Sequence, residues 1–433
     1  MRQFSVLGFF RNRPKDSAVK NLAGALHADR VGCTLQVVRE IKMEIPVERI
    51  NLMLMPHLRK TLTRALCGSM AIGLAVPLFS LLAVSASFAQ APALPAVQAT
   101  AKSPNFKDGK VALEERRIRA YTYLGGDEHI IRQTVQRIVR QEGDAAGGWV
   151  YEWSVLGKYY EERGDALVNT GPRRAALDAY MTSNIYYALA WFPSINSEQE
   201  AKAYDAQLRV YQKGGKLFDV PLEVVKVPYK GGQITTYLHK PVGVEKPPLV
   251  IWCGGVDQYK GNHWRPIQDM LAKGFAVATL DLPGFGESRQ WDRETNAEAN
   301  VAVLETYLKR GDLDTKRISL FGQSYGAGAT LRMALRNDPR VKAIVDMCGA
   351  LHLGGNNSLK PEAKPGDKLI NGPMLVVNGT RDAGNPVADL MSTYQAAKEG
   401  DLWLLGRGEH CAVEYWPVVI PQMADWLIEK INK

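Results

Sequence analysis

Apolar side chains recur every three or four positions between residues 113 and 218, a spacing typical of amphipathic helices. Asn196 or Ser197 can cap the last of these segments, which Gly214-Gly215 closes. The recurring apolar positions include Ile130, Ile131, Val135, Ile138, Trp149, Trp153, Leu156, Tyr160, Ala176, Tyr180, Tyr187 and Trp191. We therefore expect a helical unit over residues 113–218, in which any single aromatic side chain is first of all a helix-packing residue.

A different pattern begins at residue 219, where short apolar runs alternate with helix-length segments. The first two runs, Leu222–Tyr229 and Gln233–His239, meet at Gly231-Gly232 and predict a hairpin. The later runs are Leu249–Trp252, Phe275–Leu280, Ile318–Phe321, Ala343–Met347, Met374–Asn378 and Leu402–Leu405. Strands that alternate with helices predict an α/β fold, with a doubly wound, mostly parallel sheet over residues 219–433.

The N-terminal part of the chain has the pattern of a secretory signal peptide. Residues 65–89 hold no charged side chain and end in Ser87-Phe88-Ala89, a small-x-small cleavage site. The basic residues just before this stretch are Arg59, Lys60 and Arg64. An uncleaved membrane anchor is the alternative, because the stretch is long enough to span a bilayer. Pro77 and the small-residue end favour cleavage, so we expect the mature chain to start near Gln90.

Residues 1–52 precede this signal, although signal peptides begin at the N-terminus. We expect translation to start at Met53 or Met55, which makes residues 1–89 an overextended N-terminus plus a signal peptide at about 53–89. Residues 90–112, rich in Ala and Pro at their start, are expected to be a linker. The predicted location is the periplasm or the medium, with no stable membrane anchor after cleavage.

Composition and charge exclude several classes of protein. The 433 residues are 46% hydrophobic and 23% charged, which argues against disorder, collagen and coiled coil. Most of the net charge of +9 lies in residues 1–89, so the remaining chain has no strong basic excess and nucleic acid is not an expected partner. After cleavage the cysteines are Cys253, Cys348 and Cys411. Their odd number and spacing do not suggest a zinc site. Export permits disulfides, but a large core does not need one, so we expect none.

Candidate chemistry starts at Gly322-Gln323-Ser324-Tyr325-Gly326, the one GxSxG sequence in the chain. The apolar run Ile318–Phe321 precedes it and a helical segment follows, which is the setting of a nucleophile elbow. Small residues two positions before and after the serine relieve crowding in such a turn. The sequence therefore predicts Ser324 as a nucleophile, in preference to an ordinary glycine turn.

A serine hydroxyl needs a base, and the base needs a carboxylate that orients it. In an α/β-hydrolase sheet the chain order is serine, acid, histidine, and only His352 and His410 follow Ser324. His410 follows the last strand and is the predicted base. Asp382 lies in the loop that follows the preceding strand, Met374–Asn378, and is the predicted acid. Asp346 and Asp389 are the alternatives.

The loop after Leu249–Trp252 is expected to complete an oxyanion hole. Tyr325 N–H is one predicted donor, and Gly255 or Val256 supplies the other. Asp257 follows in the same loop and has two interpretations. It caps the next helix, as Asp often does, or it is a polar group that touches substrate beside the oxyanion hole.

These motifs carry a resemblance to known enzymes. The GQSYG elbow, the acid loop Gly379–Asp382 and the terminal Gly408-Glu409-His410 resemble the α/β-hydrolase superfamily. The helical unit and the loop from Gly254 to Lys260 are similar to the FrsA-like esterase family and its relatives, 2,6-dihydropseudooxynicotine hydrolase and fungal hydrolases that shorten polyketide pigment precursors. The resemblance covers about 115–433 and implies that the N-terminal helices form a cap over the site. The chain departs from the relatives' His-Gly-Gly at Cys253.

We therefore expect a serine hydrolase that uses Ser324, His410 and Asp382 on a small ester, without a metal or organic cofactor. Hydrolysis of a C–C bond in a β-dicarbonyl compound is the alternative, and a non-catalytic binding protein on a hydrolase scaffold is a second. The expected partner is a small-molecule substrate in a closed pocket between cap and core, and a homodimer is left open. The predicted substrate contacts are Asp257, Tyr180, Tyr187 and Trp191.

Overall fold

The computed structural model describes residues 106–432, apart from 108–109, 142 and 354–357. The predicted signal peptide, and the linker up to residue 105, lie outside the described residues. Among the described helices, none is both long and apolar enough to cross a membrane. The described part of the chain begins with a short hairpin of β1 (Phe106–Lys107) and β2 (Lys110–Val111).

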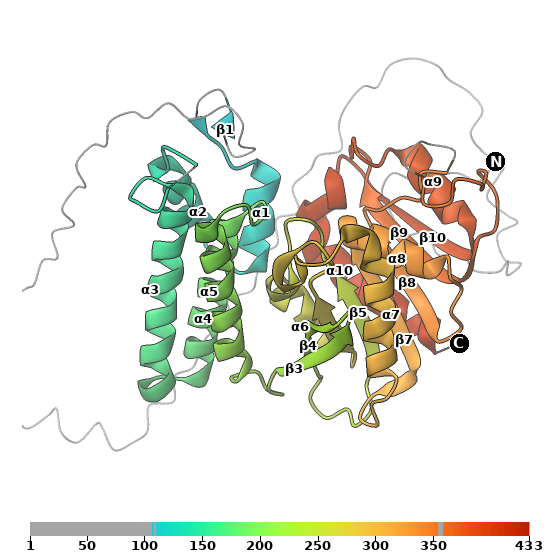
Figure 1. Cartoon of the computed structure of the whole chain (residues 1–433), viewed down its shortest axis with the longest axis horizontal. Helices are drawn as coiled ribbons and strands as arrows, with labels where there is room; N and C mark the ends of the chain where they lie inside the picture. Colours follow the sequence, from blue (N-terminus) through green and yellow to red (C-terminus); the bar gives the residue numbers. More distant parts are fainter. Residues whose placement is uncertain (1–105, 108–109, 142, 354–357, 433) are drawn as a thin grey trace, which may run out of the picture. The chain divides into compact units, whose positions relative to one another are not determined.

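An eight-stranded sheet forms the core of residues 219–433, and it confirms the predicted α/β fold class (Figure 1). The strand order is β10-β9-β8-β7-β5-β6-β4-β3, antiparallel at β3/β4 and β4/β6 and parallel elsewhere. The strands are β3 (Glu223–Tyr229), β4 (Gly232–His239), β5 (Pro248–Cys253), β6 (Ala276–Leu280), β7 (Asp314–Gln323), β8 (Val341–Met347), β9 (Ile370–Gly379) and β10 (Ala397–Leu405). The inner strands β5 and β6 are buried along their whole length, which explains their continuous apolar runs.

Helices cover both faces of this sheet. On one face α6 (Trp264–Ala272) packs against α10 (Trp416–Ile431), and on the other α7 (Asn296–Tyr307) packs against α8 (Tyr325–Ala334). Helix α9 (Val387–Ala396) connects β9 to β10. Because β5, β7, β8, β9 and β10 are parallel, the loops that follow them leave the sheet at the same edge.

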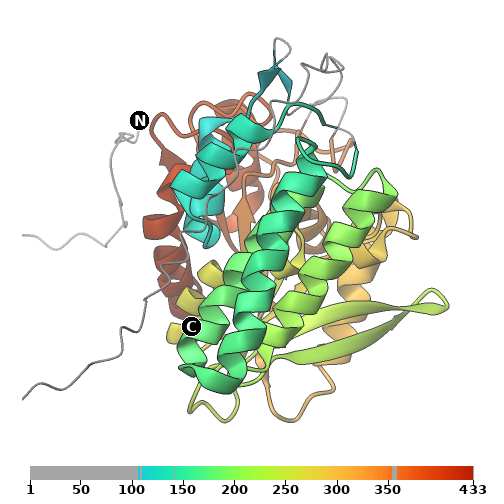
Figure 2. The ribbon, with the colours of Figure 1, turned by 90° about the vertical axis from the view of Figure 1, so that its left-hand side faces the viewer.

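Five helices are present among the described residues of the helical unit. They are α1 (Glu115–Leu124), α2 (Glu128–Arg137), α3 (Trp149–Thr170), α4 (Arg173–Trp191) and α5 (Glu198–Gly215). Ser197 caps α5 by accepting a hydrogen bond from Glu200 N–H, as one of the two predicted caps. Helices α3, α4 and α5 pack side by side (Figure 2).

Helices α4 and α5 pack on the loop that follows β5. Asn184 Nδ2 donates to the Gly261 carbonyl at 2.9 Å, and Gln207 Nε2 donates to Asn262 Oδ1 at 3.1 Å. The Trp191 ring stacks on Tyr259 with 4.2 Å between centroids. These contacts hold in place the loop that carries the predicted oxyanion donors Gly255 and Val256.

A buried lysine joins the same loop to both parts of the structure. Lys260 is fully buried, and its Nζ lies 2.6 Å from Asp281 Oδ2 and 3.0 Å from the Tyr204 hydroxyl of α5. Burial opposes the charge of Lys260, but the nearby carboxylates of Asp281 and Glu287 raise its pKa above the ordinary value. The carboxylate partners of Lys260 belong to the same part of the chain as the lysine, and the helical unit adds the Tyr204 hydroxyl as a further partner.

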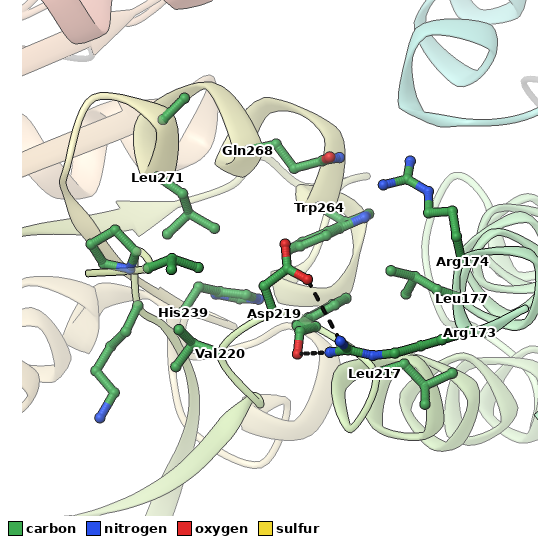
Figure 3. Close-up of a pocket in the computed structure, with 15 residues that line it drawn as sticks. Arg173, Arg174, Leu177, Leu217, Asp219, Val220, His239, Trp264, Gln268 and Leu271 are labelled. Carbon is green, nitrogen blue, oxygen red and sulfur yellow. Dashed lines mark hydrogen bonds and ion pairs between the residues drawn. The ribbon is translucent and has the colours of Figure 1, made fainter. Parts of the chain in front are cut away.

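A cavity of about 580 Å³ lies at the other end of the contact between the helical unit and the sheet (Figure 3). Leu177, Trp264 and Leu271 form apolar parts of its wall, and Arg173 donates to the Phe218 carbonyl across it. His239, at the end of β4, also lines it and pairs with the start of β6. The cavity therefore lies near the amino ends of the parallel strands, at the opposite edge from the loops that carry the predicted site.

We expect the free energy of unfolding to fall as the pH drops below neutral, because two buried histidines stay neutral. Burial lowers the pKa of His239 to about 4 and that of His263 to about 3. Above pH ~6.5 both groups are neutral in the folded and unfolded chain, so neither affects stability. Below it the unfolded chain binds protons that the folded chain excludes, and stability is lost towards pH 4, by about 2 kcal/mol per histidine at pH ~5.

Urea unfolding at a series of pH values measures this loss. His239→Gln should flatten the profile by about one histidine's share, whereas His129→Gln, at an exposed position, should leave the profile unchanged. An unfolding free energy that is constant between pH 7.5 and 5 would contradict the prediction.

Candidate active site

Ser324 occupies a sharp turn between β7 and α8, with φ 54° and ψ −118°. A Cβ atom on Gly322 would lie 2.5 Å from Ala327 Cα, and one on Gly326 would overlap the Cys253 carbonyl oxygen. The glycines of GQSYG are therefore required by close backbone contacts on both sides of the serine. The strained serine conformation is that of a nucleophile elbow, which presents Oγ at the start of a helix.

The structure brings Ser324, His410 and Asp382 into one hydrogen-bonded chain. Ser324 Oγ lies 2.8 Å from His410 Nε2, and His410 Nδ1 lies 2.7 Å from Asp382 Oδ2. His410 begins the turn that follows β10, and Asp382 lies in the loop that follows β9. Their loops meet because the two strands are parallel neighbours.

Asp382 is held as a carboxylate by three hydrogen bonds. Burial alone would raise its pKa, but hydrogen bonds from His410 and Asn378 outweigh burial and hold the pKa below the usual range. Asn378 Nδ2 donates to Asp382 Oδ2 at 2.7 Å, and Gly384 N–H donates to Oδ1 at 2.8 Å. An ionised Asp382 can accept a hydrogen bond from Nδ1–H of His410, which keeps the proton on Nδ1 and leaves Nε2 free to accept the serine proton.

Asn378 is a supporting residue that the sequence analysis missed. It is fully buried at the end of β9, and its Oδ1 accepts from Cys411 N–H at 3.1 Å. One amide thus contacts both Asp382 and the backbone next to His410. The available signal was a polar side chain at the end of an apolar strand run.

The two alternative acids have other surroundings. Asp346 is fully buried, and burial raises its pKa to about 7. Its Oδ1 accepts from Gly349 N–H at 2.9 Å, whereas Oδ2 has no hydrogen-bond partner among the described residues. Asp389 lies 3.3 Å from His352 Nδ1. Asp382 is the one of the three that contacts His410.

The loop after β5 places Gly255 beside Ser324. A Cβ atom on Gly255 would lie 3.1 Å from Ser324 Cβ and 3.5 Å from its Oγ. Val256 follows with a side chain that is 40% exposed, and Tyr325 is the first residue of α8. The predicted oxyanion donors therefore adjoin Ser324, and the choice between Gly255 and Val256 stays a prediction.

Asp257 does not cap a helix, so that interpretation is wrong. The caps of the two helical segments that follow are Tyr259 and His263. The Asp257 carboxylate instead forms an ion pair with Arg117 of α1, at 2.5 Å between Oδ2 and Nη2. A side chain of the helical unit thus reaches the loop after β5, which holds the predicted oxyanion donors and is called the oxyanion loop below.

The three aromatic residues expected to contact substrate are packing residues in the structure. Tyr180 and Tyr187 are buried against Gly164 and Gly157 of α3, which leave room for their rings. Trp191 is fully buried, donates from Nε1 to a glutamine of α5 at 2.7 Å and stacks on Tyr259. We correct these predicted roles, because contacts within the helical unit and with the oxyanion loop occupy the rings.

A cavity of about 690 Å³ adjoins the triad on the side of the histidine. His410 and Asp382 line it, together with Arg116 of α1 and two arginines of the acid and histidine loops, Arg381 and Arg407. Arg116 lies 3.5 Å from Glu409, the neighbour of His410. The cavity is therefore polar and charged, and α1 forms one of its walls.

Cys348 and Cys411 form a disulfide, so the prediction of no disulfide is wrong. Cys411 follows His410 directly, and Cys348 Sγ lies 3.8 Å from His410 Nε2. Both cysteines have left-handed backbones, with φ 59° and φ 60°. Among the described residues, Cys348, His410 and Cys411 also form a group that could hold a metal ion, but the disulfide removes both thiolates as ligands.

Reduction of this disulfide is expected to destabilise the protein and to lower its turnover. The bond closes a loop with a sequence separation of 63, which corresponds to roughly 4 kcal/mol in the chain-entropy model. It also fixes the residue next to His410, so freedom there weakens the Ser324–His410 contact. Thermal unfolding and kinetics with and without a phosphine reductant measure both effects.

The double variant Cys348→Ser/Cys411→Ser provides the control, because the reductant should change nothing further in it. Thiol titration of the unreduced, denatured mature protein should detect Cys253 alone, the buried free cysteine. Three reactive thiols in that experiment would contradict the disulfide.

Comparisons with known proteins agree with this architecture. The family model for FrsA-like esterases matches residues 118–363. Esterase FrsA of Photobacterium profundum is 27% identical over 213 residues, which cover 48% of this chain and 51% of the relative. Esterase FrsA of Vibrio vulnificus is 28% identical over 214 residues, with 48% and 50% covered. The chain spans about half the length of the curated relatives it matches.

Solved structures share the fold. The crystal structure of 2,6-dihydroxy-pseudo-oxynicotine hydrolase is similar with a TM-score of 0.61 and 21% identity, covering 72% of this chain and 95% of that one. AbyA5 gives a TM-score of 0.53 at 18% identity, with 70% and 93% covered. These likenesses establish an α/β-hydrolase fold at low identity. Because the family model matches more than half of its residues, the chain belongs to the FrsA-like esterase family.

Proposed function

We propose that this protein is a serine hydrolase that cleaves small carboxylic esters. The observation that carries the proposal is the hydrogen-bonded chain from Ser324 Oγ through His410 to Asp382, at 2.8 Å and 2.7 Å. A binding protein on the same scaffold needs none of these three side chains. The family of esterases to which the chain belongs supports the same reaction.

The geometry supports the following sequence of steps. His410 Nε2 takes the Ser324 proton as Oγ attacks the ester carbonyl, and Asp382 stabilises the imidazolium that forms. Tyr325 N–H and a donor from Gly255 or Val256 stabilise the oxyanion. His410 then protonates the leaving alkoxide, and water releases the acyl group from Ser324 by the reverse order of proton transfers.

The helical unit serves as a cap in this proposal. Its support is the packing of α4 and α5 on the oxyanion loop, together with the contact of Arg117 with Asp257. A small substrate between these helices and the strand ends fits this arrangement better than a polymer.

The ion pair of Asp257 argues against this residue as the proton donor for cleavage of a C–C bond, the role that the alternative would give it. A carbanion leaving group requires a proton donor beside the oxyanion hole. The Asp257 carboxylate forms an ion pair with Arg117, with 2.5 Å between Oδ2 and Nη2, which makes it a poor proton donor for a leaving carbanion. An alkoxide needs only the proton that His410 has taken from Ser324.

We also propose that the mature protein is exported. The support is the apolar stretch that ends at Ser87-Phe88-Ala89 and the disulfide between Cys348 and Cys411, a bond typical of oxidising compartments. Cell fractionation of the native host, with N-terminal sequencing of the mature chain, tests this location.

A paired substrate and labelling experiment tests the activity. Mature protein is assayed on p-nitrophenyl esters of increasing acyl length and on β-diketones, and then treated with a fluorophosphonate probe. Ester turnover with labelling of Ser324 is the expected result. Failure of the folded protein to react with the probe would favour a binding protein.

A further inference from the structure

Arg117 belongs to the helical unit, but it contacts Asp257 in the loop that passes beside Ser324. The position of a Cβ on Gly255 is 3.5 Å from Ser324 Oγ and 3.6 Å from Asp257 Oδ1. The other oxygen of Asp257 contacts Arg117 Nη2 at 2.5 Å. These contacts link the guanidinium to Ser324 through Gly255 and Asp257.

The Arg117 guanidinium keeps unused hydrogen-bond donors in this place. Its side chain is only 18% exposed, and its one carboxylate partner among the described residues is Asp257. Its carbon centre lies 5.3 Å from the centroid of the Phe192 ring. A guanidinium has five N–H donors, so most of them remain available to a third group at the site.

Tyr121 adds a second unused donor one helical turn further along α1. Its side chain is 1% exposed, and its hydroxyl has no hydrogen-bond partner among the described residues. Burial, and next the charge of Asp257, raise its pKa well above the usual value, so the hydroxyl keeps its proton. Buried hydroxyls are normally satisfied, and an unpaired one beside Arg117 indicates that a ligand oxygen belongs there.

The charges of the Arg117–Asp257 ion pair determine whether a charged or a neutral ligand oxygen fits beside it. Asp257 already neutralises Arg117, so a substrate carboxylate would add an unbalanced negative charge to a largely buried place. A neutral carbonyl oxygen can accept from Arg117 and from Tyr121 without disturbing that balance. The leaving group must lie towards His410, which protonates it, whereas this place is reached from Ser324 through Gly255. The oxygen therefore belongs to the acyl part of the substrate.

We infer that Arg117 and Tyr121 form an acyl subsite for a second, neutral carbonyl oxygen, so that the substrate is an oxo-acyl ester. This inference rests on the proposed esterase function and adds the class of acyl group. Asp257 is a positioning residue in it, because it holds the guanidinium beside the oxyanion loop.

Three p-nitrophenyl esters of similar length test the subsite: the plain valerate, the 4-oxopentanoate and the hemiglutarate. We expect kcat/KM for the oxo ester to exceed that for valerate by about ten- to a hundredfold, the effect of one hydrogen bond to a charged group. The hemiglutarate should be the poorest of the three. Equal kcat/KM for the oxo and plain esters overturns the inference and leaves the esterase proposal standing. No turnover of any ester overturns both.

Variants separate recognition from folding. Arg117→Met should reduce the oxo-to-plain ratio of kcat/KM to near one, whereas Arg132→Met should keep the wild-type ratio. Arg132 is the matched control because it lies on α2, is 40% exposed and pairs with Glu115 and Glu128. Asp257→Asn should shift preference towards the hemiglutarate, because Arg117 then carries an unbalanced positive charge.

Tyr121→Phe distinguishes a ligand contact from a structural defect. It removes only the unpaired hydroxyl, so the melting temperature should stay the same or rise while the oxo-to-plain ratio falls. An unchanged ratio in both Tyr121→Phe and Arg117→Met overturns the subsite, even where the wild-type enzyme prefers the oxo ester.

Discussion

Replacement of Ser324 by alanine is expected to lower ester kcat by about 10⁶-fold, the loss seen when the serine of such a triad is removed. The hydroxyl is the only group lost, and it is the group that His410 contacts at 2.8 Å. The backbone strain at φ 54° stays, since alanine has the same Cβ as serine. The melting temperature should therefore hardly change, and kinetics with thermal unfolding of the same sample measure both quantities.

A control lies five residues earlier, on the strand that leads to Ser324. Ser319 is fully buried in β7, and its hydroxyl has no hydrogen-bond partner among the described residues. Ser319→Ala should retain turnover and fluorophosphonate labelling, whereas Ser324→Ala should lose both. Activity of Ser324→Ala within tenfold of the wild type would mean that another residue is the nucleophile.

The three side chains of the proposed triad could be chosen from the sequence because topology orders them. In a parallel sheet the loops after successive strands leave at one edge, so a serine, an aspartate and a histidine that each follow a strand must approach one another. The chain order Ser324, Asp382, His410 satisfied this rule, and the distances of 2.8 Å and 2.7 Å show the same three side chains in contact.

The Arg117–Asp257 pair could not be predicted in the same way. The two residues lie 140 positions apart, and their contact depends on how α1 is oriented against the sheet, which no apolar spacing encodes. The pattern around Asp257 fitted a helix cap equally well. The loop instead continues to Tyr259 before the next helical turn begins, which leaves the Asp257 carboxylate free to meet α1.

The tyrosines of α4 show a different limit of prediction from the sequence. Helical spacing placed Tyr180 and Tyr187 on one side of a helix, but spacing alone does not tell which neighbour that side meets. Gly164 and Gly157 of α3 decide this, because both rings fill the space that the missing side chains leave. The disulfide was missed for a related reason, since it depends on two left-handed loop residues that come within 4.7 Å at Cα.

Asp382→Asn is expected to reduce kcat by about 10⁴-fold, the loss seen when the acid of a serine triad becomes its amide. The carboxylate accepts from His410 Nδ1–H at 2.7 Å, and an amide that turns its NH₂ to that atom favours the opposite tautomer, with Nε2 protonated. Nε2 then cannot accept the Ser324 proton. Gly384 N–H favours this orientation of the amide, because it donates at 2.8 Å to the other oxygen position and so needs the amide oxygen there. Asn378 Nδ2 favours the reverse orientation, because it donates to the position that faces His410.

Asp346→Asn is the matched comparison, because Asp346 lies near the end of β8 and Asp382 follows β9, the neighbouring parallel strand. Both aspartates are buried. Asp346 contacts Gly349 N–H through Oδ1, and burial raises its pKa to about 7, so an amide imitates its protonated form closely. We expect kcat of Asp346→Asn to stay within about tenfold of the wild type, because the residue does not touch His410. A larger loss in Asp346→Asn than in Asp382→Asn would show that Asp346 orients the histidine during turnover. In that case His410 would have to turn away from Asp382, whose carboxylate is held in place by hydrogen bonds from Asn378 and Gly384.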